Sequence, residues 1–157
     1  MIVRHVETLF CDDIRHEMNG KVTFIGVYGG GLFVPAFPAT LPKLCLSIKI
    51  VTPEYEPIRS LTLRVLKDED VLQEVVVDEA QLAAASDSPE DEQEVDQEDH
   101  NGRVHVAQFM LVFSPMVFDQ PCTLRVRVRA EGGELSGLAL QVNQGGPYFD
   151  ASAGQTE

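Results

Sequence analysis

The sequence contains no tryptophan, no CxxC spacing and no uninterrupted apolar run of about 18 residues. The missing apolar run excludes a membrane-spanning helix. The N-terminus lacks a basic segment followed by an apolar stretch, so we expect no secretory signal. The three cysteines, Cys11, Cys45 and Cys122, are an odd number without zinc-ribbon spacing. We therefore expect reduced, buried thiols in a cytoplasmic protein.

Basic residues are also scarce, because 12 Lys and Arg stand against 25 Asp and Glu, for a net charge of −13. Such a charge disfavours nucleic acid and anionic membranes as partners. Residues 86–100 hold eight of the carboxylates and no Lys or Arg, so the rest of the chain has 17 acids against 12 bases. We predict a disordered acidic loop at residues 86–102, which either binds a basic partner or is a solvated insertion.

Helical pattern is almost absent, and only residues 79–85 are typical of a helix. Elsewhere, apolar and polar side chains alternate in short stretches that end at Gly-, Pro- or Asp-rich turns. About eight or nine such strands predict an all-β fold, an antiparallel β-sandwich that is immunoglobulin-like in the broad sense. A closed β-barrel is the alternative. We expect a single domain over residues 1–143 and a flexible tail over residues 144–157.

The clearest hairpin pattern lies near the C-terminus. Along its first strand the inward residues are Leu124, Val126, Val128 and Ala130, and the outward residues are Arg125, Arg127 and Arg129. After the turn, a bulge at Gly137 is needed to bring three apolar residues to the core side, namely Leu138, Leu140 and Val142. The arginine stripe is a candidate interaction surface. It is alternatively a solvated face, a partner for acidic residues on a neighbouring strand, or an edge guarded by charge.

Sequence motifs of enzymes and metal sites are missing as well. The chain has no Gly-x-Ser-x-Gly and no HExxH, and no Lys-Ser or Lys-Thr follows the glycines at 29–31. We therefore assign no catalytic residue and no cofactor. Asp12, Asp13 and Glu17 are the candidate metal ligands, because loop carboxylates supply the oxygens that Ca²⁺ prefers. His5 and His16 flank the aspartates, but without the spacing of known zinc motifs.

The segment from Cys11 to Gly31 places these charges in a hairpin pattern. Asn19-Gly20 is typical of a two-residue type I′ turn, which needs positive φ at both central residues. A turn there lets Ile14 meet Ile25, and it leaves Asp13 and Arg15 on one strand face, where we predict a structural ion pair. Alternatively, Asp12 starts a turn, or one of the aspartates caps a single helical turn that ends near Gly20.

The residues Cys11-Asp12-Asp13-Ile14-Arg15, Glu17, Gly20-Lys21 and Ile25-Gly26-Val27-Tyr28 carry a resemblance. They are similar to the N-terminal motif Cys-Asp-Asp-Ile-Arg-x-Glu…Lys…Ile-Gly-x-Tyr of a family of small bacterial proteins of unknown function. The similarity is specific over residues 9–31 and rests elsewhere on length and strand pattern. It implies a bacterial, cytoplasmic origin, and it implies no activity, cofactor or catalytic residue.

Three functions are compatible with these observations. The first is a non-catalytic module that binds a protein partner or forms a homo-oligomer through a sheet edge or end loops. The second is a metal-ion or small-ligand binding module centred on Asp12, Asp13 and Glu17. The third is an enzyme whose site is assembled only in space. We expect the first, because strand edges are abundant and no catalytic motif is present.

Overall fold

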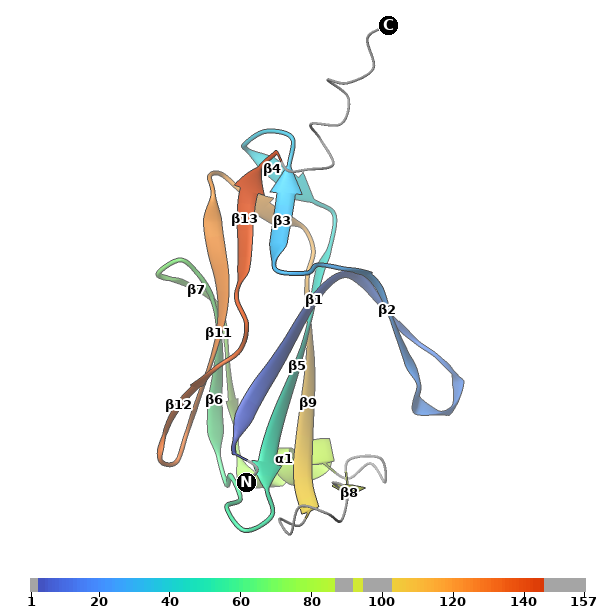
Figure 1. Ribbon diagram of the computed structural model, residues 1–157, viewed down its shortest axis with the longest axis vertical. Coiled ribbons are helices and arrows are strands. Elements are labelled where there is room, and N and C mark those ends of the chain that lie inside the picture. The colour runs from blue at the N-terminus through green and yellow to red at the C-terminus, as the bar shows by residue number, and fades with distance from the viewer. Residues whose placement is uncertain (1–2, 87–91, 95–102, 146–157) are drawn as a thin grey trace, which may run out of the picture.

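Two facing β-sheets form the body of the protein (Figure 1). The structure is a computed structural model that describes residues 3–86, 92–94 and 103–145. The first sheet has the strand order β2-β1-β5-β9-β8, all antiparallel. Its strands are β1 (His5–His16), β2 (Val22–Val27), β5 (Leu44–Pro53), β8 (Glu92–Glu94) and β9 (Arg103–Phe113).

The second sheet has the order β3-β13-β11-β6-β7, with β12 paired to one end of β11. Its strands are β3 (Gly31–Val34), β6 (Leu61–Lys67), β7 (Asp70–Val77), β11 (Cys122–Ala130), β12 (Gly133–Ser136) and β13 (Leu140–Gln144). The β3–β13 pair is parallel, and the other pairs are antiparallel. A small separate pair joins β4 (Ala39–Leu41) to β10 (Met116–Phe118).

The predicted sandwich is confirmed, and in the described part of the chain neither large sheet closes into a barrel. More strands are present than the expected eight or nine, because five of those described have only three or four residues, too few for a visible alternation. Inward side chains of both sheets form one apolar core. Its fully buried members include Leu46, Ile48 and Ile50 of β5, Leu63 and Val65 of β6, and Leu124, Val126 and Val128 of β11.

The short helix is confirmed as α1 (Glu79–Ser86). Asp78 precedes it and accepts a hydrogen bond from the Gln81 main-chain N–H at 2.8 Å, while the Gln81 side chain accepts one from the Asp78 N–H at 3.0 Å. This reciprocal arrangement is a capping box, which satisfies N–H groups that a helix start leaves free. No helix in the described residues has the length and apolar character needed to cross a membrane.

The first hairpin differs from the predicted one by a single residue. Asn19 and Gly20 both have positive φ, as predicted, but the connection is a three-residue 3-10 turn, η1 (Met18–Gly20), closed by the Glu17 N–H to the Lys21 carbonyl at 2.7 Å. The longer loop pairs Ile14 with Phe24 and Asp13 with Ile25. Ile14 and Ile25 therefore lie on opposite faces rather than meeting, because a one-residue shift exchanges the faces of a strand. A single helical turn does end at Gly20, but neither aspartate caps it, since β1 runs on to His16 and Glu17 is the residue before η1.

The C-terminal hairpin follows the predicted alternation closely. Leu124, Val126 and Val128 are buried, and the register shifts by one residue between the Arg127↔Ser136 and Leu124↔Leu140 pairs, which encloses Gly137. This shift returns Leu140 and Val142 to the core, as predicted. Leu138 is the exception, because it lies inside the irregular segment and is 81% exposed. The predicted acidic loop and flexible tail fall largely outside the described residues.

Candidate interaction site on the hairpin arm

The β1–β2 hairpin leaves the sandwich at Cys11. Pairing of β1 with β5 ends at Cys11↔Cys45, whereas pairing with β2 continues to His16↔Val22. Residues 12–27 therefore extend from the sandwich without strand pairing to β5, and Figure 1 shows this hairpin on the right of the view. We call residues 12–27 the hairpin arm. Its root is built from the same residues that carry the sequence motif.

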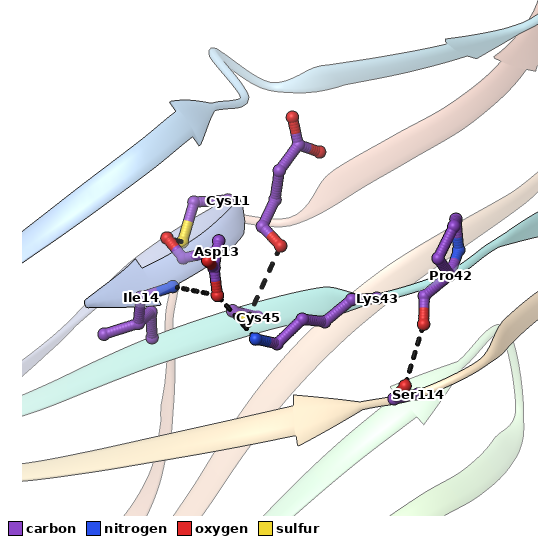
Figure 2. Close-up of polar contacts among 8 residues, drawn as sticks. Cys11, Asp13, Ile14, Pro42, Lys43, Cys45 and Ser114 are labelled. Atoms are coloured by element: carbon purple, nitrogen blue, oxygen red, sulfur yellow. Dashed lines mark hydrogen bonds and ion pairs between the residues drawn. The ribbon is translucent and has the colours of Figure 1, made fainter. Parts of the chain in front are cut away.

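Two buried thiols lie where the strands part. The Cys11 thiol donates to the Asp13 carbonyl at 3.4 Å, and the Cys45 thiol donates to the Asp12 carbonyl at 3.8 Å. Figure 2 labels Cys11, Asp13 and Cys45 at this point. Both side chains are fully buried, and burial raises the pKa of Cys11 to about 11 and also raises the pKa of Cys45. A thiol with a raised pKa is a poor nucleophile at neutral pH. The pair therefore closes the root of the arm by packing and weak hydrogen bonds.

Asp12 holds the return strand of the arm. Its carboxylate accepts a hydrogen bond from the Tyr28 hydroxyl and covers Gly26, where a Cβ atom would overlap it. Gly26 also has φ of +66°, a conformation that favours glycine. Burial, followed by the hydrogen bond to Asp12, raises the pKa of Tyr28, so its hydroxyl remains a donor. Asp12, Gly26 and Tyr28 together fix the angle at which β2 rejoins the body.

Asp13 fixes the outgoing strand to β5. It forms an ion pair with Lys43 at 2.5 Å and accepts a hydrogen bond from the Ile14 N–H at 2.9 Å (Figure 2). The Lys43 contact lowers the pKa of Asp13, to which Arg15 adds only the smallest effect. The sequence predicts an Asp13–Arg15 pair, but Arg15 lies 3.7 Å from Glu17 instead. Since Lys43 is distant in the sequence, only the pairing of β1 with β5 brings it to Asp13.

The three candidate metal ligands are thus turned to different partners. Asp12 accepts from Tyr28, Asp13 pairs with Lys43, and Glu17 accepts from the Thr23 hydroxyl at 3.2 Å and pairs with Arg15. Within residues 3–86, 92–94 and 103–145, no three His, Cys, Asp or Glu side chains gather as they would around a metal ion. What the structure brings together instead is a root for the arm that is held by hydrogen bonds and an ion pair.

Apolar side chains are exposed along one face of the arm and the neighbouring sheet. The pairs Val27↔Cys11, Cys11↔Cys45 and Cys45↔Val112 define one row across β2, β1, β5 and β9. The thiols in the middle of this row are buried, whereas Val27 and Val112 at its ends are 54% and 53% exposed. Ile25, one step farther along β2, is 40% exposed. This apolar row is unusual for an outward sheet face, which is normally polar.

The outer edge of β2 is unpaired in the described part of the chain, because β2 ends its sheet. Its sequence, Val-Thr-Phe-Ile-Gly-Val, has no charge and no proline. Natural edge strands are usually protected by charge, proline or short length. Both edges of the second sheet show this protection: β7 carries Asp70 and Glu74, and β3 has four residues followed by Pro35. Only β2 among these three lacks it.

A shallow cavity of about 160 Å³ separates the arm from the sheet. Phe24 of β2 lines it together with residues of β1 and β5, namely Glu7, Thr8, Leu9, Ser47 and Lys49. Phe24 is half-buried, so the inner side of the arm is partly in contact with the body while its outer edge faces solvent.

The arginine stripe lies on the outward face of the second sheet. Glu134 of β12 sits among three arginines, at 3.4 Å from Arg64, 3.8 Å from Arg127 and 3.5 Å from Arg129. The stripe is therefore partly neutralised by an acidic residue of the adjacent strand, which is one of the alternatives that the sequence left open. Arg125 lies on the same face opposite Leu66.

A larger cavity of about 320 Å³ lies under α1, at the opposite end of the sandwich from β4 and β10 (Figure 1). Its walls are mainly apolar, with Ile50, Leu61, Leu82 and Ala107 among the lining residues. Glu79 and His105 also line it, and both are exposed. An enzyme site assembled in space would need further groups beside these two, so the third function stays a prediction.

A two-sheet sandwich with a projecting hairpin defines the class of protein. Within that class, the chain belongs to DUF6941, a family of unknown function, whose model matches residues 8–143. The expectation of such a family is confirmed, and the matched region includes the hairpin arm. Neither the curated proteins nor the solved structures contain a match to the chain.

Sequence reasoning missed Lys43 and the roles of Gly26 and Tyr28. Lys43 carries no local signal, since it stands alone after Pro42. Gly26 did carry one, because a glycine inside an apolar strand often marks a close approach of another group. The role of Tyr28 follows from that of Gly26, because residues two positions apart in a strand lie on the same face.

Proposed function

We propose that this protein is a non-catalytic protein-interaction module of the bacterial cytoplasm and that it binds its partner along the outer edge of β2. The observation that carries the proposal is the uncharged, unprotected edge of β2 on a projecting arm. An extended segment of a partner can add to such an edge by main-chain hydrogen bonds, while exposed side chains supply selectivity.

The root of the arm supports this proposal. Asp12, Asp13 and Tyr28 hold the two strands at a set angle, through the Asp12–Tyr28 and Asp13–Lys43 contacts. An edge that is already ordered before binding loses less conformational freedom on association. Ile25 and Val27 add apolar surface beside the edge, of the kind found at the centre of interfaces.

The proposed location rests on separate observations. The three cysteines are free and buried, which suits a reducing compartment. The motif resemblance implies a bacterial origin.

A photo-crosslinking experiment in cells tests the function. Benzoylphenylalanine placed at Val27 should give covalent adducts with protein, and the same group at Val76 of β7 should not. Val76 is a matched control, since it is 67% exposed on an edge strand of the other sheet. The Val27 adducts should disappear when Ile25→Lys is added. Equal adducts from both positions, or none from Val27, would contradict the proposal.

A further inference from the structure

We propose that the partner strand is the β2 strand of a second copy, so that two arms pair antiparallel into a four-stranded sheet β1–β2–β2′–β1′ about a twofold axis. This inference rests on the proposed function and names its partner. Twofold symmetry is the commonest arrangement of homo-oligomers, and it places the same patch on both sides of the contact.

The composition of β2 suits pairing with itself. In an antiparallel pair related by a twofold axis, the residue at the axis faces its own copy, and each residue on one side of the axis faces the residue equally far on the other side. A charge at the axis, or two like charges placed evenly about it, would therefore face a like charge. Strand β2 (Val22–Val27) contains no charged residue, and therefore no register of the pair opposes two like charges within the strand. Strand β7 contains Asp70 and Glu74, so the same arrangement with its axis at Leu72 would bring carboxylates together.

The centre of the contact falls near Ile25. A register that uses most of β2 places the twofold axis within about two residues of Ile25 on either copy. Ile25 is 40% exposed and shares its face with Val27 at 54%. Pairing would bring the two copies of this apolar surface together, and the apolar row that continues to Val112 would lie beside them.

Charge elsewhere in the chain opposes association and sets its salt dependence. Residues 12–27 carry three carboxylates against two basic residues, whereas the whole chain has a net charge of −13. Two copies therefore repel each other through their bodies rather than through their arms. Added salt screens this repulsion, so the arm-paired dimer should become tighter as ionic strength rises. If residues 86–100, which hold eight carboxylates, instead docked on the arginine stripe of a second copy, added salt would weaken the dimer.

Sedimentation equilibrium of the full chain tests the inference, with Ile25→Lys, Ile25→Glu and their equimolar mixture as the key samples. Each variant alone should weaken self-association at least about tenfold, because like charges then meet at the axis. The mixture should regain association, since opposite charges then face each other. Val76→Lys and Val76→Glu should leave the dimer dissociation constant unchanged, and thermal unfolding should confirm that all four variants fold.

Several results would overturn the inference. One is a wild-type chain that stays monomeric up to millimolar concentration. Another is a dimer that the Ile25 variants do not weaken, or one that loosens with added salt. If the purified chain is monomeric while Val27 still crosslinks a different protein in cells, the self-pairing is wrong and the proposed function survives. If neither dimer nor adduct is found, both are wrong.

Discussion

The two hairpins β1–β2 and β11–β12 meet the body differently, because β1–β2 projects from the sandwich whereas β11–β12 is part of the second sheet. Strand β11 alternates strictly, with buried Leu124, Val126 and Val128 facing the core and arginines facing out. Strand β2 has no such division, because apolar residues occupy both of its faces. The charged face of β11 is partly neutralised by Glu134, whereas Ile25 and Val27 on the second apolar face of β2 remain 40% and 54% exposed. A second apolar face on an edge strand is therefore the feature on which the proposed contact outside the chain rests.

Each hairpin also depends on a glycine that another side chain covers. A Cβ atom on Gly26 would overlap Asp12, and one on Gly137 would overlap the Thr8 side chain of β1. Thr8 donates a hydrogen bond to the Leu138 carbonyl at 2.7 Å, which ties the irregular segment after β12 to the other sheet. In the arm, by contrast, the close approach of Asp12 to Gly26 joins β1 only to β2. The C-terminal hairpin is thus joined across the sandwich by a hydrogen bond, whereas the polar contacts of the arm with the body lie at its root and only Phe24 approaches the sheet farther along.

Truncating one apolar residue in each hairpin should give the largest difference. Leu124→Ala removes a fully buried side chain of β11 and should lower the free energy of unfolding by about 2–5 kcal/mol. Ile25→Ala removes a partly exposed side chain of the arm and should cost about 1 kcal/mol or less. Urea unfolding at low protein concentration measures both values. Comparable losses would mean that the arm is part of the cooperative core.

Substituting the glycine at the arm root should have an intermediate effect. Gly26→Ala forces alanine into positive φ and displaces the Asp12 carboxylate from Tyr28, at a combined cost of about 2–4 kcal/mol. Gly20→Ala is the matched control, because Gly20 has a similar φ of +74° and a Cβ atom added there would meet no other atom within 4 Å. It should cost about 1–2 kcal/mol. Equal losses in thermal and urea unfolding would show that the Asp12 contact is not important.

The smallest effect should come from the ion pair that joins the arm to β5. Lys43 lowers the pKa of Asp13 below its ordinary value of 3.8, so the stabilisation is present above that value and is lost as the pH falls through the lowered pKa. Asp13 in turn raises the pKa of Lys43, so the same stabilisation is lost again at strongly alkaline pH.

Asp13→Asn should therefore lower the melting temperature slightly at neutral pH, by less than Gly26→Ala does. The difference from wild type should vanish in strong acid. Melting curves recorded across the acid range check this, and Asp119→Asn, at an exposed aspartate outside both hairpins, serves as the control for removing an exposed carboxylate. A difference that persists unchanged at the lowest pH would contradict the assigned pair.

Much of the fold was predictable because it depends on local pattern. Alternation in β6 and β11, the helix after Asp78 and the bulge around Gly137 are each visible within a dozen residues. The candidate site was predictable only as a segment. Its position in the chain and its hairpin were evident, but the partners of Asp12 and Asp13 were not, since local spacing favoured Arg15 over the distant Lys43.

By itself, then, the sequence determined the two-sheet class, the family and the place of the unusual strand, because periodicity of side chains within a strand needs no knowledge of the neighbouring strands. Tertiary structure decided how that strand is presented. One extra residue in the η1 turn moved Ile25 to the face beside Asp13, and the end of the β1–β5 pairing at Cys11 released the arm from the body. Both outcomes depend on loop length and on contacts between distant segments, which set register and strand order but leave no periodic trace in the chain.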